Sequence, residues 1–211
     1  MTEGGLEWSE FHRRSLQRPS RELLRRTLGC FELSKRPPGV AVDLGCGAGV
    51  DTLELLRRGW EVHAVDSDGH AIALLKESVP ESARPQLRTY VARLEEFRLP
   101  RCDLVWAGYS LPYCPASHWS DLWSRIVAAL RPNGRFAGDI FGDRHAWARN
   151  PGVLTIMEAV LRDQLKDLVI EAFDVEDGVR PSGGRLTRWH AFGVAVRKST
   201  TKNRIGKQVG A

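Results

Sequence analysis

The stretch GVAVDLGCGAGV, residues 39–50, decides how the chain folds. Its apolar run, 40–42, leads directly into Asp43. The turn that follows contains three glycines: Gly45, Gly47 and Gly49. A short apolar run that ends in a glycine-rich turn is typical of a buried strand passing into a helix. Glycines at such a turn let the backbone bend sharply and let a ligand approach it closely.

Apolar runs and helical patterns alternate along the rest of the chain. Residues 50–58 have apolar side chains at helical spacing, and Gly59 ends that pattern. We expect strands at 61–65, 87–92, 102–107 and 135–141, and helices after Ser67 or Asp68, at 118–130 and near 153–166. Strands that alternate with helices predict an α/β fold with a doubly wound, mostly parallel sheet and helices on both faces.

Two β-rich runs close the folded part of the chain, at 168–175 and 186–196. The turn between them, 177–184, is too short for a crossover helix, so the two strands must be antiparallel. We expect three segments: an N-terminal helical lid at 1–37, a domain at 38–197, and a basic, flexible tail at 198–211.

Composition excludes several classes of protein. The 211 residues are 42% hydrophobic and 27% charged with a net charge of +5, as in a soluble globular domain. No apolar run reaches the roughly 20 residues of a membrane span, and the first residues lack a secretory signal pattern. The four cysteines form no CxxC pair, so we expect no metal site, no disulfide framework and a cytoplasmic location.

Acidic residues near the glycine turn point to the class of ligand. Open parallel sheets bind ligands at the carboxyl ends of their strands, where Asp66 closes the second strand and can accept hydrogen bonds from a ribose. The dinucleotide pattern GxGxxG fails because Val50 occupies its sixth position. Asp43 disfavours a pyrophosphate and favours a ligand that carries an ammonium group.

Residues 42–68, VDLGCGAGVDTLELLRRGWEVHAVDSD, resemble the first two motifs of class I S-adenosylmethionine-dependent methyltransferases. The resemblance continues to about residue 197 and includes the LRPNG turn at 130–134. Within the class, the chain is most similar to the small bacterial TehB-like or type 11/12 methyltransferases. The resemblance implies a Rossmann-like seven-stranded sheet with an antiparallel last strand, and S-adenosylmethionine as cofactor.

The resemblance also implies roles for particular residues near the cofactor. Asp43 would lie beside the methionine ammonium, and Asp66 would bind the ribose hydroxyls. The other expected cofactor-binding residues are Gly45, Cys46 and Gly47 along the methionine and ribose, Ser67 beside the adenine, Ala107 to Tyr109 facing the sulfonium, and Arg18 or Arg21 on the methionine carboxylate. Arg93 stands where the family often has Asp and cannot accept a hydrogen bond, so adenine recognition passes to the Leu94 backbone.

The acceptor side is expected in the loop 109–115. It resembles the (N/D/S)PP(Y/F) motif of amino-group methyltransferases, although Leu111 replaces the first proline. Tyr113 is our candidate for a wall of the methyl pocket, with simple apolar packing as the alternative. His190, next to Trp189 in the last strand, is our candidate general base, and a hydrogen-bonded core histidine is its alternative.

These features together predict an S-adenosylmethionine-dependent methyltransferase that acts on a small molecule or a short peptide by in-line transfer. The alternatives are a catalytically silent cofactor-binding subunit that activates a partner, a nicotinamide dehydrogenase, and a nucleic-acid methyltransferase. We expect neither a membrane nor a nucleic acid as partner. The residues leave the oligomeric state and the methylated atom open.

Overall fold

The computed structural model describes residues 18–182 and 185–200. Its strands are β1 (Val40–Leu44), β2 (Glu61–Asp66), β3 (Leu87–Val91), β4 (Cys102–Ala107), β5 (Leu130–Phe141), β6 (Val169–Ser182) and β7 (Arg185–Arg197). They form one seven-stranded sheet in the order β3-β2-β1-β4-β5-β7-β6. Strand β7 is antiparallel to both β5 and β6, and the other pairs are parallel. The predicted fold class is confirmed.

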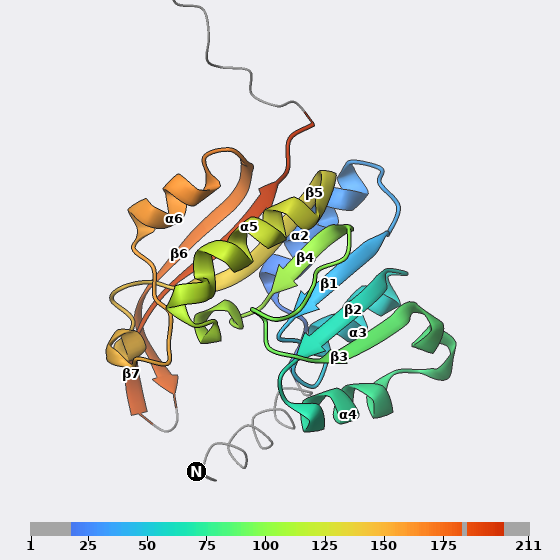
Figure 1. Cartoon of the computed structure of the whole chain (residues 1–211), viewed down its shortest axis with the longest axis horizontal. Coiled ribbons are helices and arrows are strands. Elements are labelled where there is room, and N and C mark those ends of the chain that lie inside the picture. The colour runs from blue at the N-terminus through green and yellow to red at the C-terminus, as the bar shows by residue number, and fades with distance from the viewer. Residues whose placement is uncertain (1–17, 183–184, 201–211) are drawn as a thin grey trace, which may run out of the picture.

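Helices cover both faces of this sheet (Figure 1). One face packs against α2 (Glu22–Leu33), α3 (Val50–Arg57) and α4 (Gly69–Ser78). The other packs against α5 (Trp119–Ala129) and α6 (Glu158–Leu165). Short 3-10 helices complete the described chain: η1 (Glu81–Gln86), η2 (Leu111–Tyr113), η3 (Ala116–His118) and η4 (Ala146–Arg149). Because parallel strands need crossovers, this two-sided cover follows from the strand–helix alternation.

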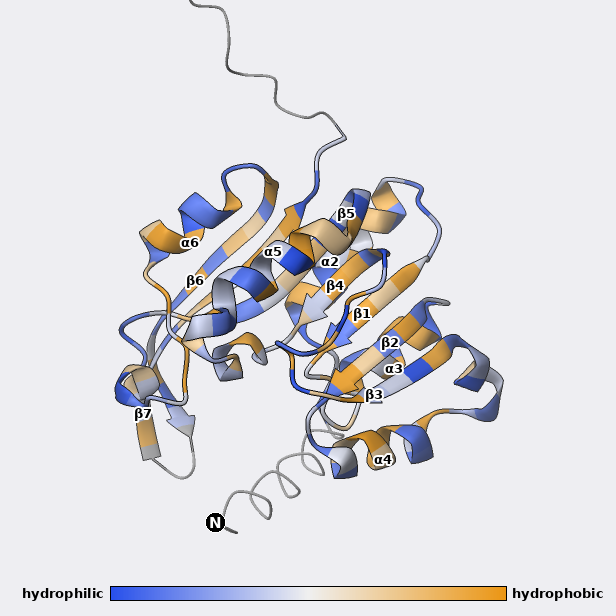
Figure 2. Cartoon of the chain, viewed as in Figure 1, coloured by the Kyte–Doolittle hydropathy of each residue, from blue (hydrophilic) through white to orange (hydrophobic). Residues whose placement is uncertain are grey.

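Hydrophobic residues concentrate in the central strands, as the orange segments of β1, β2 and β4 show in Figure 2. Every residue of β4 is buried. A strand covered on both faces has no solvent side, so its sequence reads as a continuous apolar run rather than an alternation. The apolar runs that predicted these strands therefore form part of the hydrophobic core.

The β6–β7 hairpin is longer than expected. The predicted turn at 177–184 is wrong, because Asp177 pairs with His190 and the ladder continues to Ser182 and Arg185. Turn-forming residues in this segment misled the prediction. Strand β6 lies at the edge of the sheet, where a proline such as Pro181 is tolerated.

Two further boundaries differ from expectation. Strand β5 begins at Leu130 rather than 135, since Leu130 pairs with Cys102 before a bulge. Helix α6 begins at Glu158 rather than 153, because Ile156 bridges to Gly142 instead of joining the helix.

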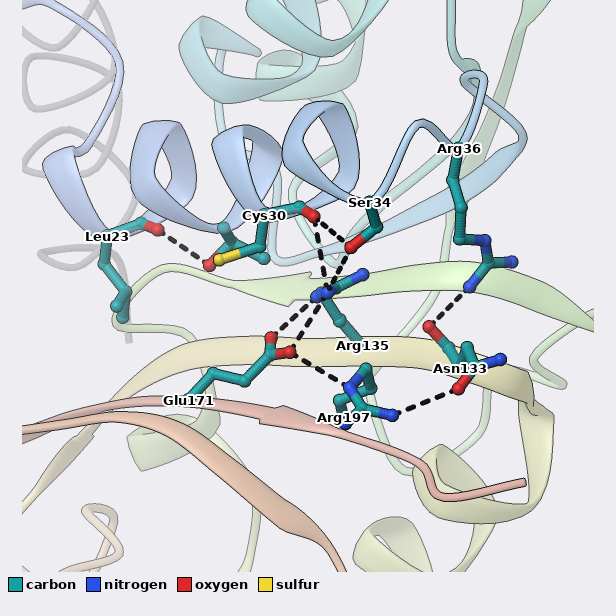
Figure 3. A network of polar contacts seen from close by, with 9 residues as sticks. Leu23, Cys30, Ser34, Arg36, Asn133, Arg135, Glu171 and Arg197 are labelled. Atoms are coloured by element: carbon teal, nitrogen blue, oxygen red, sulfur yellow. Dashed lines mark hydrogen bonds and ion pairs between the residues drawn. The ribbon is translucent and has the colours of Figure 1, made fainter. Parts of the chain in front are cut away.

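A buried arginine holds α2 against the sheet (Figure 3). The Arg135 guanidinium pairs with Glu171 through Nε at 2.6 Å and is only 3% exposed. Its Nη2 lies 3.4 Å from the Cys30 carbonyl of α2. Arg197 joins the same carboxylate at 3.1 Å and reaches Asn133 at 3.0 Å. The network ties α2, β5, β6 and β7 together at the end of the sheet opposite the glycine turn.

The two ends of the chain are described only in part. Residues 1–17 of the expected lid and 201–211 of the expected tail lie outside the described residues. Lys198, where the tail was expected to begin, is anchored by its Nζ to the Val127 and Leu130 carbonyls. Across residues 18–182 and 185–200, no helix combines the length and apolar character that crossing a bilayer requires.

Candidate functional site

The glycine turn leaves β1 at the carboxyl edge of the sheet and is tied to β2. The backbone N–H groups of Gly45 and Cys46 both donate to the Val65 carbonyl, at 2.8 and 2.9 Å. Gly45 has φ +73°, and a Cβ there would lie 2.2 Å from the Ser110 Cβ. Glycine is therefore required by both conformation and space, and the loop after β4 packs directly on the loop after β1.

Asp66 is held at the end of β2 by backbone donors. Its Oδ2 accepts a 2.8 Å hydrogen bond from the Gly47 N–H, and its Oδ1 accepts one of 2.9 Å from the Asp68 N–H. Each carboxylate oxygen keeps a further lone pair. The carboxylate is thus oriented in advance and can still accept from a diol.

Asp43 is a buried carboxyl group, 1% exposed, on the sheet face covered by α2 and α3. Burial and the nearby negative charge of Asp51 raise its pKa to about 7, against the lowering effects of a 2.6 Å hydrogen bond from Thr52 and the charge of Arg18. A carboxylate that is costly to ionise is stabilised by a cationic ligand beside it. The site therefore favours an ammonium-bearing ligand.

Asp51, in the first turn of α3, accepts hydrogen bonds from two segments: the one that precedes α2, and β4. It accepts from Arg18 Nη2 at 2.9 Å, from the Arg21 backbone N–H at 3.0 Å and from Trp106 Nε1 at 3.2 Å. Sequence reasoning missed Asp51, although its signal is present as an acid just after the glycine turn. The contact places the predicted cofactor ligand Arg18 beside Asp43, whose pKa its charge lowers.

The remaining predicted cofactor residues occupy different surroundings. Ala107 ends β4 and is fully buried, and Tyr109 follows it with φ +57°. Ser67 is exposed at the end of β2, whereas Leu94 is buried in the cluster beneath α5. Burial and the charges of Asp43 and Asp66 raise the pKa of the Cys46 thiol, so the thiol is uncharged at neutral pH.

A second polar group lies beyond Tyr109, and its acids were missed by sequence reasoning. The Tyr109 hydroxyl lies 3.4 Å from Glu176 Oε2, which also accepts from Trp189 Nε1 at 2.8 Å. The Arg21 guanidinium lies 4.6 Å from the centre of the Tyr109 ring. Asp139 on β5 is 8% exposed, and burial raises its pKa to about 7. Asp139 lies inside a strand whose sequence reads as core, and Glu176 lies just past the expected end of its strand.

The two predicted catalytic residues lie on different elements, His190 on β7 and Tyr113 on η2. His190 contacts Phe192 on the α5 and α6 side of β7, whereas its neighbour Trp189 faces Tyr109. Both His190 ring nitrogens lie near Arg144, at 3.1 Å from its N–H and 3.0 Å from its guanidinium. Tyr113 is 40% exposed on η2. Their catalytic roles stay predictions.

The side chains present suit a thioether nucleoside that carries positive charge. The site offers a buried carboxyl group, Asp43, for a cation and a backbone-held carboxylate, Asp66, for a diol. Its glycine loop allows a ligand to approach the backbone closely. No group of three or more His, Cys, Asp or Glu side chains in the described chain is arranged to hold a metal ion.

The strand order, the acid before the glycine turn and the acid that ends β2 together define the class I methyltransferase fold. Residues 41–134 match the family model described as a methyltransferase domain. Residues 41–134 are thus similar to a methyltransferase domain, and the fold is that of the class I methyltransferases, a class whose methyl donor is S-adenosylmethionine.

Individual proteins resemble part of the chain in sequence or most of it in fold. It is 34% identical over 93 residues to the magnesium-protoporphyrin O-methyltransferase of Rhodobacter capsulatus, a match that covers 42% of each protein. TehB from Haemophilus influenzae has a TM-score of 0.68 at 16% identity, with 82% of this chain and 62% of TehB covered. The 1,6-didemethyltoxoflavin-N1-methyltransferase of Burkholderia thailandensis has a TM-score of 0.60 at 23% identity, with 84% and 79% covered. The chain therefore spans less than half of the curated relative's length, and the structural likenesses establish the fold.

Proposed function

We propose that the chain is an S-adenosylmethionine-dependent methyltransferase that acts on a small molecule or a short peptide. The observation that carries the proposal is the pair of acids flanking the glycine turn, buried Asp43 and backbone-held Asp66. Two of the compared proteins, from Rhodobacter and Burkholderia, are named for small-molecule methylation, which supports that substrate class.

In this proposal each residue has a defined physical task. Bound S-adenosylmethionine supplies an electrophilic methyl group on a sulfonium. Asp43 binds the ammonium, Asp66 binds the ribose hydroxyls, and Arg18 turns from Asp51 toward the methionine carboxylate. Tyr109 and the loop after β4 exclude water beside the reacting methyl group, where alignment of donor and acceptor supplies much of the rate.

Calorimetric titration of the protein with S-adenosylmethionine and with NAD tests the cofactor assignment. We expect S-adenosylmethionine to bind and NAD not to bind. Asp43→Asn and Asp66→Asn should each weaken donor binding by at least about tenfold, since each loses a charge-assisted contact. Asp68→Asn is the matched control, because it removes the acid two residues from Asp66 while the amide oxygen can still accept from His70 and cap α4.

Formation of S-adenosylhomocysteine with an added acceptor separates an enzyme from a silent, partner-activating subunit. A cytoplasmic location is also part of the proposal, supported by four cysteines that are all free thiols: Cys30, Cys46, Cys102 and Cys114. NAD binding in place of S-adenosylmethionine, or unchanged donor binding in both acid variants, would refute the proposed site.

A further inference from the structure

We propose that Asp139 contacts the methyl acceptor and takes its proton, and that the acceptor's nucleophile is a hydroxyl group. This inference rests on the methyl transfer proposed above and names the atom that receives the methyl. It comes from two buried polar atoms in the same part of the site that lack hydrogen-bond partners among the described residues: Asp139 Oδ2 and Arg21 Nε.

The two atoms are complementary. Asp139 Oδ2 is an acceptor without a donor, and Arg21 Nε–H is a donor whose nearest acid, Asp51, is 3.8 Å away. The charge of Arg21 lowers the pKa of Asp139, so the two side chains interact. A hydroxyl group both donates and accepts, and can therefore satisfy Asp139 and Arg21 at once.

Strand register places Asp139 on the face of the sheet that carries the proposed S-adenosylmethionine site. Asp43 lies opposite Trp106, and Trp106 lies opposite Ala137, two residues before Asp139. Alternate residues of a strand share a face, so Asp139 faces the same side as Asp43. The Arg21 Nε lies 2.9 Å from where a Cβ on Gly108 would be, within the segment expected to face the sulfonium.

A guanidinium beside the nucleophile favours oxygen over an amine. A hydroxyl oxygen has one lone pair to accept from Arg21 and a second to attack the methyl carbon. An amine nitrogen has a single lone pair, and its methylation leaves positive charge that Arg21 would repel. The same positive charge stabilises the oxygen as its proton leaves.

The transfer step balances with groups already named. The acceptor oxygen forms a bond to the methyl carbon while that carbon's bond to sulfur breaks, and sulfur keeps the electron pair to become a neutral thioether. The hydroxyl proton passes to the Asp139 carboxylate and leaves to solvent after the product departs. The products are a methyl ether and S-adenosylhomocysteine.

The charges around Asp139 suit a base at neutral pH. Burial raises its pKa to about 7; Arg21 and Arg18 lower the pKa, while Glu176 on β6 and Asp51 on α3 raise it. Strand β7 contributes Gly193 beside the carboxyl and so adds no side-chain charge. A base with a pKa near the working pH transfers protons most effectively.

Aromatic neighbours guide the choice of probe. The Tyr109 ring contacts Phe141 and Trp189, with centroids 5.7 and 5.5 Å apart, so a flat ring fits this wall. The test presents phenol, benzyl alcohol, aniline, benzylamine and thiophenol with methyl-labelled S-adenosylmethionine. We expect the label on the oxygen acceptors at least about tenfold faster than on the amines or the thiol.

Asp139→Asn should slow transfer to phenol by about 100-fold, the scale of losing a positioned base. The affinity for S-adenosylmethionine should stay within about twofold of the wild-type value, since Asp139 lies outside the residues proposed to bind it. Saturation-transfer NMR with S-adenosylhomocysteine present should show weaker phenol binding in this variant. The matched control is Asp174→Asn, which changes the acid on β6 that shares the Gly193 row with Asp139 and pairs with Arg26 at the surface.

Each outcome decides the matter. Faster transfer to an amine or thiol than to either oxygen compound overturns the inference, as does a wild-type rate in Asp139→Asn. Absence of transfer to both oxygen compounds by a protein that binds the donor also overturns it. A wild-type protein that binds no S-adenosylmethionine in the separate calorimetric titration instead defeats the proposed function.

Discussion

The Thr52 hydroxyl lies 2.6 Å from Asp43 Oδ2 and donates a hydrogen bond to that buried carboxyl. The bond lowers the pKa of Asp43 against the opposing effect of burial. Thr52→Val keeps the shape but removes the donor, so the pKa of Asp43 should rise further, by on the order of one unit. NMR titration of the Asp43 carboxyl carbon measures the shift. Ser124→Ala, which removes a hydroxyl from the exposed side of α5, should leave it unchanged.

Donor binding should depend on pH through Asp43. Only the ionised carboxylate attracts an ammonium, and its pKa is about 7. Affinity for S-adenosylmethionine should therefore fall as pH drops below about 7, approaching tenfold per unit, and level off above it. Calorimetry between pH 5.5 and 8 measures this slope. A pH-independent affinity in the wild-type protein, or an unchanged slope in Asp43→Asn, would contradict the role of this carboxyl.

Two glycine substitutions should change stability in opposite directions. Gly45→Ala forces a side chain into a φ of +73° and against Ser110, so unfolding free energy should fall by about 1–2 kcal/mol from backbone strain alone. Gly29 lies inside α2, and a Cβ added there would meet nothing within 4 Å, so Gly29→Ala should stabilise the protein by about 1 kcal/mol. Urea denaturation measures both. Equal effects of the two substitutions would argue against a special backbone at Gly45.

Asp51→Asn should loosen the segment that precedes α2. The carboxylate accepts from Arg18, from the Arg21 N–H and from Trp106 Nε1, and the amide cannot pair with the guanidinium charge. We expect faster hydrogen exchange in this segment and faster tryptic cleavage after Arg21, with unchanged exchange in α5; Arg18 precedes Pro19 and is not a tryptic site. Asp121→Asn, which breaks an exposed pair with Arg125 on α5, is the control. Unaltered cleavage in Asp51→Asn would show that other contacts hold the segment.

Arg135→Ala should lower the free energy of unfolding by about 3 kcal/mol, because it leaves the Glu171 carboxylate without its buried partner. Arg162→Ala breaks an exposed pair on α6 and should cost under about 1 kcal/mol. Thermal and urea unfolding measure the difference. Similar losses in the two variants would mean that the network in Figure 3 does not fasten α2.

The sheet was predictable because its signals are local. The run before Asp43 and the run 102–107 are buried on both faces, and a continuous apolar run records that directly. The hairpin was mispredicted because the pairing of Asp177 with His190 is a long ladder that overrides turn-forming residues. Tertiary pairing of this kind leaves no periodic signal in a single strand.

The candidate site likewise contains residues that a local sequence pattern marks and residues that only the tertiary structure brings in. Asp43 and Asp66 follow apolar runs at strand ends, where a local pattern marks them. Asp139 and Glu176 lie within strands, and only the order of β5, β7 and β6 brings them beside Tyr109. His190 could not be placed from the sequence because a one-residue step along β7 exchanges one face of the sheet for the other.

Asp43 and Asp139 are both buried on one face of the sheet, and the pKa of each is raised to about 7. Mild acidification therefore adds two protons to the same face of the sheet within one narrow interval. If each carboxylate serves as proposed, turnover should switch off with a doubled slope, losing about a hundredfold per unit well below neutrality. The activity would then respond to a fall in pH before the fold itself is affected.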